Sequence, residues 1–116
     1  MPPITEMHGL LIADHEPTAD RISSLSGNIA SMVDASRLTA SDDEHDPEGT
    51  TIAFELSQAS TLLDAARNHL VDVDAAIARV TAGNHGYCER CGQAVARGRL
   101  LARPTARTCI SCAVAG

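Results

Sequence analysis

The chain has 116 residues, a formal net charge of −6 and almost no aromatic residues, with one Phe, one Tyr and no Trp. This length predicts one domain or a small module with an extended arm, and an apolar content of mostly Ala, Leu, Ile and Val favours long helices packed on each other. No apolar run approaches the roughly 18 residues of a membrane span, and nothing at the N-terminus resembles a signal peptide. We therefore expect a cytoplasmic protein without membrane contact.

Charge is divided unevenly along the chain. Residues 1–87 carry four Arg against fourteen Asp and Glu, a balance of −10, whereas residues 88–116 carry five Arg against one Glu, a balance of +4. Binding of duplex DNA depends on neutralising phosphates, so an acidic arm on a basic C-terminal part argues against sequence-specific DNA binding. The division favours docking on a large protein with oppositely charged surfaces.

Residues 1–17 form an N-terminal segment whose structure the pattern leaves open. A partly apolar run at residues 7–12 precedes Pro17. Proline is tolerated in the first turn of a helix but bends or breaks its interior, so a following helix is expected to begin near Thr18 unless it extends upstream through this run.

A repeat at alternating intervals of three and four runs from about Thr18 to Ala40, with apolar residues at first and a weaker pattern towards its end. The positions are Ile22, Leu25, Ile29, Met32, Ser36 and Thr39. This spacing places them on one face of a helix, and the face must be buried against a partner.

A stronger pattern covers the residues from about Pro47 to Ala82. Two series repeat every seven residues: Leu56, Leu63, Leu70 and Ile77, and Ile52, Ala59, Ala66, Val73 and Val80. These are the a and d positions of a heptad repeat, and Gly83 with Asn84 marks the end of the helix. The two apolar faces predict an antiparallel coiled-coil hairpin over residues 18–82.

The connection at residues 41–49 is acidic, with five Asp or Glu among nine residues. Asp46 as N-cap, Pro47 in the first helical turn and Glu48 near the positive end of the helix dipole form an ordinary helix start. That explanation leaves out Asp43 and its acidic neighbours. Two readings stay open, a solvated charge run and a functional acidic tip.

Four cysteines lie in the segment of residues 83–116, as the pairs Cys88/Cys91 and Cys109/Cys112 with seventeen residues between the pairs. Cys-x-x-Cys pairs at this spacing are typical of a structural zinc site with four thiolates, which stabilises a lobe too small to fold on apolar burial alone. We therefore predict one structural Zn²⁺ in a small C-terminal knob. Two disulfides or a thioredoxin-like redox pair are the alternatives.

The same region carries a family resemblance. Residues 85–92 read His-Gly-Tyr-Cys-Glu-Arg-Cys-Gly, and residues 99–112 read Arg-Leu-Leu-Ala-Arg-Pro-Thr-Ala-Arg-Thr-Cys-Ile-Ser-Cys. Their Gly-Tyr-Cys-x-x-Cys-Gly start, Arg-Leu-x-Ala-x-Pro stretch and closing Cys-x-x-Cys resemble the DksA/TraR family of bacterial transcription regulators. With the acidic run and the helix after it, the likeness spans about residues 41–113.

The resemblance implies a mainly α fold in which a coiled-coil hairpin is joined to a four-cysteine zinc-finger knob. It also implies that RNA polymerase is the partner, with the hairpin tip entering the secondary channel towards the catalytic magnesium to modulate initiation. The tip motif of better-studied members is Asp-x-x-Asp-x-Ala. Asp43 and Asp46 match its two aspartates, but Glu48 stands at the Ala position; if Asp46 is instead the first aspartate, Gly49 stands at the second.

Some family members bind the alarmone ppGpp together with polymerase through basic residues. Arg103 fits one such position, and Arg99 and Arg103 are candidates to contact polymerase or ppGpp, or to brace the knob. The resemblance implies a basic ppGpp contact on the second helix, but Asp72 and Asp74 in that region are acidic, which argues against a ppGpp response. Tyr87 and Leu100 are expected in the core of the knob.

Functions of other classes remain as alternatives. One is a zinc-finger module that binds nucleic acid or acts as a protein adaptor. Only the Arg residues of the knob support this alternative. An enzyme is not expected, because four protein ligands leave zinc no open position and metal-bound thiolates are committed ligands. The acidic tip keeps one enzymatic alternative open, in which it holds a second metal and helps polymerase to cleave RNA. His85 lies close to the first pair, yet four thiolates already complete the shell. We expect a monomer.

Overall fold

The computed structural model describes residues 2–39 and 47–115, and most of these residues are helical. The four helices in chain order are α1 (Ile4–Thr39), α2 (Pro47–Ala82), α3 (Arg97–Ala102) and α4 (Ile110–Ala115). Among the described residues, β pairing is limited to one antiparallel bridge between Tyr87 and Ala94. The predicted mainly α fold, a long helical hairpin with a four-cysteine C-terminal part, is confirmed.

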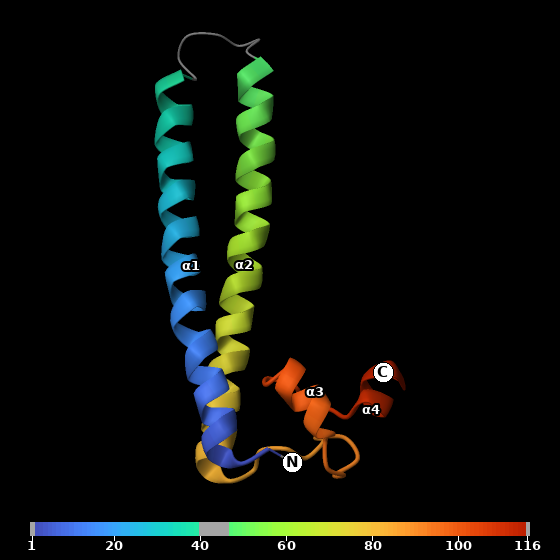
Figure 1. Ribbon diagram of the computed structural model, residues 1–116. Helices are drawn as coiled ribbons and strands as arrows, with labels where there is room; N and C mark the ends of the chain where they lie inside the picture. The colour runs from blue at the N-terminus through green and yellow to red at the C-terminus, as the bar shows by residue number, and fades with distance from the viewer. Residues whose placement is uncertain (1, 40–46, 116) are drawn as a thin grey trace. The chain divides into compact units, whose positions relative to one another are not determined.

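Helices α1 and α2 run antiparallel, side by side, along the hairpin (Figure 1). α2 has the bounds that the heptad pattern predicts. α1 begins at Ile4, well before the expected start near Thr18, and continues through Pro17. Pro17 has no N–H to donate to the carbonyl four residues earlier, so other contacts must hold this part of α1 in a helix.

The heptad positions of α2 form the apolar seam that faces α1. All nine have restricted exposure: Ala59, Leu63, Ala66, Val73 and Val80 are buried, and Ile52, Leu56, Leu70 and Ile77 are half-buried. The described positions of the α1 pattern, Ile22, Leu25, Ile29, Met32 and Ser36, are half-buried. The periodicity therefore predicted the buried faces of both helices.

α2 ends in a hydrogen-bonded turn built on glycine. The Gly83 N–H donates to the Val80 carbonyl at 3.2 Å, and the Asn84 N–H donates to the Arg79 carbonyl at 2.9 Å. Gly83 has a φ of +79°. These are the two bonds of a Schellman motif, which needs a left-handed residue just after the helix, and they turn the chain towards the cysteines.

The chain divides into two units, Met1–Pro17 with Leu70–Gly116 (unit 1) and Thr18–His69 (unit 2). Unit 1 contains a core built from three parts of the sequence. Its buried members are Met7, Leu11, Val73, Ala76, Val80, Cys88, Val95 and Leu100. Burial of Met7 and Leu11 in this core explains why the residues before Pro17 are helical, because tertiary packing overrides a weak local preference.

The two residues expected in the core of the knob have different outcomes. Leu100 is fully buried, as predicted, but the prediction for Tyr87 is wrong because its side chain is 55% exposed. Tyr87 follows a turn at Gly86, which has a φ of +92°, and pairs through its backbone with Ala94 in the isolated bridge. Its backbone is used in this bridge, while the buried position beside it is taken by Cys88.

None of the described helices contains a stretch both long and apolar enough to cross a membrane.

Candidate metal centre

The first cysteine pair lies in a tight turn that follows α2. The Cys88 N–H donates to the Gln93 carbonyl at 2.8 Å, and the Gly92 N–H donates back to the Cys88 carbonyl at 2.9 Å. Gly92 has a φ of +74°, which favours glycine. The turn brings Cys88 and Cys91 together, and Cys88 packs into the core of unit 1.

The second pair lies at the start of α4. Cys109 immediately precedes the helix, Cys112 lies within it, and the Ala113 N–H donates to the Cys109 carbonyl at 3.0 Å. The Glu89 N–H donates to the Arg107 carbonyl at 2.9 Å. This bond ties the first turn to the segment that leads into the second pair.

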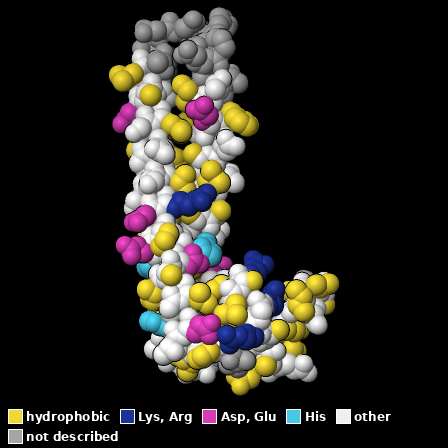
Figure 2. Space-filling model, in the orientation of Figure 1, with side chains coloured by type: hydrophobic (Ala, Val, Ile, Leu, Met, Phe, Trp, Pro, Cys, Tyr) yellow, Lys and Arg dark blue, Asp and Glu magenta, His cyan; other side chains and the backbone are white. Residues whose placement is uncertain are grey.

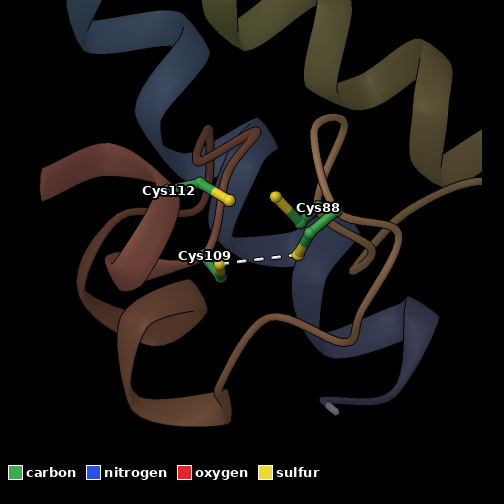
Figure 3. A group of neighbouring side chains, drawn as sticks. Cys88, Cys109 and Cys112 are labelled. Atoms are coloured by element: carbon green, nitrogen blue, oxygen red, sulfur yellow. Dashed lines mark hydrogen bonds between the residues drawn. The ribbon is translucent and has the colours of Figure 1, made fainter. Parts of the chain in front are cut away.

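The four sulfur atoms converge. They all lie within 4.8 Å of one another, and the Sγ atoms of Cys91 and Cys109 are 3.8 Å apart. Figure 3 shows the Cys88, Cys109 and Cys112 side chains turned towards one another. A tetrahedral ion with Zn–S bonds of about 2.3 Å places its sulfurs about 3.8 Å apart. The cluster therefore fits a tetrahedral zinc site, and all four cysteines are free of disulfides.

The electrostatics of the cluster also favour a cation. A hydrogen bond from the backbone of Cys109, helped by one from Cys91, lowers the pKa of the Cys88 thiol to about 6. Hydrogen bonding with the Cys109 and Cys88 side chains raises the pKa of the Cys112 thiol to about 12. Neighbouring thiolates repel, so all four are deprotonated together near neutral pH only when a cation shares their charge.

The other residues singled out in the sequence lie apart from this cluster or beyond the described residues. Arg99 is half-buried, and its Nε donates to the Thr108 carbonyl at 2.8 Å, next to Cys109. Arg103 is exposed, and its backbone N–H donates to the Arg99 carbonyl. Asp43 and Asp46 lie outside the described residues.

Side-chain contacts that the sequence did not indicate connect the knob to the long helices within unit 1. Arg97 pairs with Glu6 at 3.4 Å, and Arg107 lies 3.6 Å from Glu89 and 4.0 Å from Asp72. Acidic and basic side chains lie beside one another over this part of the molecule in Figure 2. These partners are far apart in the sequence, so no local spacing reveals them.

Asp74 and His85 are two further polar residues of unit 1, one paired and one with an unpaired ring nitrogen among the described residues. Asp74 accepts from His15 Nε2 at 2.9 Å, which links α2 to α1. His85 is buried, and its Nε2 lacks a hydrogen-bond partner among the described residues. Burial lowers the pKa of His85, and the positive charge of Arg79 lowers it further.

Comparison with known proteins agrees with this geometry. Residues 83–114 match the family model of the prokaryotic DksA/TraR C4-type zinc finger. The chain is 37% identical over 49 residues to the RNA polymerase-binding transcription factor DksA of Haemophilus influenzae, covering 42% of this chain and 34% of that protein. It is 35% identical over 63 residues to an uncharacterized protein of Aquifex aeolicus, covering 51% of this chain and 43% of that one. The chain thus spans less than half the length of these relatives.

A solved structure resembles the whole fold. Transcription factor DksA2 of Pseudomonas aeruginosa superposes with a TM-score of 0.79 at 21% identity, covering 97% of this chain and 81% of that one. The match establishes a shared fold, and the C4 zinc-finger match together with the four clustered cysteines establishes one structural zinc ion. Residues 83–114 therefore match a C4-type zinc finger of the DksA/TraR family, in a chain that shares the fold of the DksA2 structure.

Proposed function

We propose that this protein is a transcription regulator that binds RNA polymerase and inserts the tip of its hairpin into the secondary channel to modulate initiation. The observation that carries the proposal is the combination of a DksA/TraR zinc finger with an antiparallel hairpin of the DksA2 fold in one chain. In this proposal the protein acts as a monomer in the cytoplasm, where it meets polymerase.

The zinc centre has a structural role in this proposal. Cys88, Cys91, Cys109 and Cys112 hold the ion, and four thiolates leave no position for water or substrate. The centre therefore supports the fold and performs no catalysis, and the protein is a regulator without enzymatic activity. When bound, zinc supplies the cross-link between the two cysteine pairs that so small a lobe needs.

The proposed contact with the polymerase active site is the acidic tip. Asp43 and Asp46 lie between the two long helices in sequence, and α2 alone is about 54 Å long at 1.5 Å per residue. Carboxylates interact with hard cations such as magnesium, so acidic groups at the end of a hairpin suit a role near the catalytic magnesium.

A ppGpp response is not part of the proposal. Asp72 and Asp74 lie on the part of α2 where a basic contact is wanted, and both take part in contacts within unit 1, with Arg107 and His15. Arg103 is exposed, and we assign it, with Arg99 as a weaker candidate, to the contact with polymerase.

The nucleic-acid alternative is weakened by the contacts of the knob arginines. Four of the five have partners within the chain: Arg90, Arg97, Arg99 and Arg107. Electrostatic binding of nucleic acid depends on cations that are free to neutralise phosphates. The positive balance of residues 88–116 is therefore mostly used to hold the knob together.

A photo-crosslinking experiment with core RNA polymerase tests the proposal. A photoreactive amino acid at position 45, between Asp43 and Asp46, should crosslink to the polymerase segments that line the secondary channel. The matched control carries the same group at Val114, an exposed residue of α4, and should not reach those segments. A chain that does not bind core polymerase, or that binds it without a crosslink from position 45 to the channel, would refute the insertion.

A further inference from the structure

The second cysteine pair is held in place by partial packing on the core of unit 1 and by polar contacts. α4, which carries Cys112, has six residues and buries none of them. The segment between α3 and Cys109 has no regular structure. Its backbone is fixed at separate points, including the Thr105 carbonyl, which accepts from Arg79 Nη2 at 3.4 Å. Ala106, Cys109 and Cys112 pack against the core of unit 1 but are only half-buried, so polar contacts add to the control over where the sulfur atoms of this pair lie.

Two arginine side chains contact the backbone at either end of this pair. Arg99 of α3 donates from Nε to the carbonyl of Thr108, the residue before Cys109, at 2.8 Å. Arg90, between the two cysteines of the first pair, donates from Nη1 to the Cys112 carbonyl at 3.3 Å. One contact fixes the entry to the second pair, and the other ties its far end to the first pair.

The charge of the two side chains suits the same task. Four thiolates around one Zn²⁺ carry a net charge of −2, and a guanidinium remains positive at any ordinary pH. Groups that orient metal ligands from outside the coordination shell change metal affinity by about 10- to 100-fold when they are removed.

We propose that Arg90 and Arg99 form an arginine clamp that positions Cys109 and Cys112 for zinc, and that the clamp sets how tightly and how long the ion is held. The proposal rests on the ligand set proposed above. Arg90 and Arg99 are positioning residues: they act on the carbonyl groups beside the ligands and do not bind the ion. Arg99 makes the larger contribution, because its bond is shorter and its side chain is half-buried.

The test compares zinc affinity and zinc release in the full chain, using competition with a chromophoric chelator. R99Q should lower zinc affinity by about 10-fold or more, and R90Q/R99Q should approach about 100-fold with faster release. R97Q is the matched control, because it removes one positive charge from the same helix as Arg99. The interaction that it breaks is the ion pair with Glu6, which does not involve the cysteines. The zinc affinity of R97Q should equal that of the parent.

Cobalt(II) titration supplies a second readout, the geometry of the ligands around the metal. The visible absorption of cobalt bound by thiolates reports whether its four ligands are tetrahedral. R99Q should weaken and distort this spectrum. R99K keeps the charge but not the planar donor, so it should restore little of the affinity.

The outcomes separate the clamp from the ligand set. A parent chain with one zinc, together with Arg90 and Arg99 variants that bind and release zinc as R97Q does, would overturn the clamp alone. Equal weakening by R97Q, or full recovery with R99K, would also overturn it, because net charge would then be sufficient. A parent chain that binds no zinc would overturn both proposals. If R99Q lowers the helical content, the test rests on R90Q, because Arg90 is exposed and its substitution should leave the fold intact. R90Q should then release zinc faster than the parent at unchanged helical content.

Discussion

Truncation of Leu63 to Ala is the most direct test of the hairpin seam. Leu63 is 8% exposed, and the neighbouring seam positions Ala59 and Ala66 are buried but small. Among the described residues of unit 2, Leu63 is therefore the one large apolar side chain that is buried. Small neighbours cannot expand to fill the space that its removal leaves, so the substitution should leave a cavity in the seam.

The expected cost follows from this position. Buried Leu→Ala substitutions cost about 2–5 kcal/mol, and a seam between only two helices belongs near the lower end, so we expect about 2–3 kcal/mol. At about 4 °C per kcal/mol for a domain near this size, the melting temperature should fall by about 8–12 °C. Thermal unfolding followed by far-ultraviolet circular dichroism measures the change, with zinc content checked to remain at one per chain.

The adjacent Leu62 is a matched control, because Leu62→Ala removes the same atoms from a side chain that is 42% exposed. It should change the free energy of unfolding by no more than about 0.5 kcal/mol. Equal losses in the two variants, or no loss with Leu63→Ala, would show that the heptad positions do not form the interhelical contact.

Three further predictions concern the knob and the tip. Native mass spectrometry should find one zinc with four reduced thiols, and Cys109→Ser should weaken zinc binding and unfold the knob; disulfides under cytosolic redox conditions would contradict the ligand set. Asp43→Asn with Asp46→Asn should leave folding and polymerase binding unchanged, since Asn also caps a helix, but should abolish the effect at sensitive promoters; full regulation by this variant would reduce the tip to a solvated loop. The lowered pKa of His85 means that the unfolded chain takes up a proton first as pH falls, so the His85 contribution is present above pH about 6.5 and is lost below it. His85→Asn should therefore reduce the fall in unfolding free energy between pH 7 and about 5, and an unchanged pH profile would exclude this contribution.

Much of the hairpin was predictable from local pattern. The seven-residue repeat from Ile52 to Val80 identified the buried face of α2, because a helical period and the need to bury one face leave a single arrangement. Pro47 and Gly83 marked its ends, since proline suits a first helical turn and glycine suits the left-handed residue after the last. The two Cys-x-x-Cys pairs likewise predicted a cluster, and the four sulfurs lie together.

The beginning of α1 was decided by tertiary structure. Pro17 made a helix over residues 1–17 uncertain from the sequence. Met7 and Leu11 are nevertheless fully buried against side chains from α2 and the knob, among them Leu100. Burial of this size outweighs a poor local preference, and no pattern within seventeen residues identifies a partner about ninety residues away.

The contacts around the cysteines were also hidden in the sequence. Spacing identified which residues converge, but it gave no sign that Arg99 donates to the Thr108 carbonyl or that Arg107 lies between Asp72 and Glu89. Periodicity reports the side of an element that is buried, because burial is common to every turn of that element. A hydrogen bond to a single backbone carbonyl depends on the path of an irregular loop, and the folded chain alone determines that path.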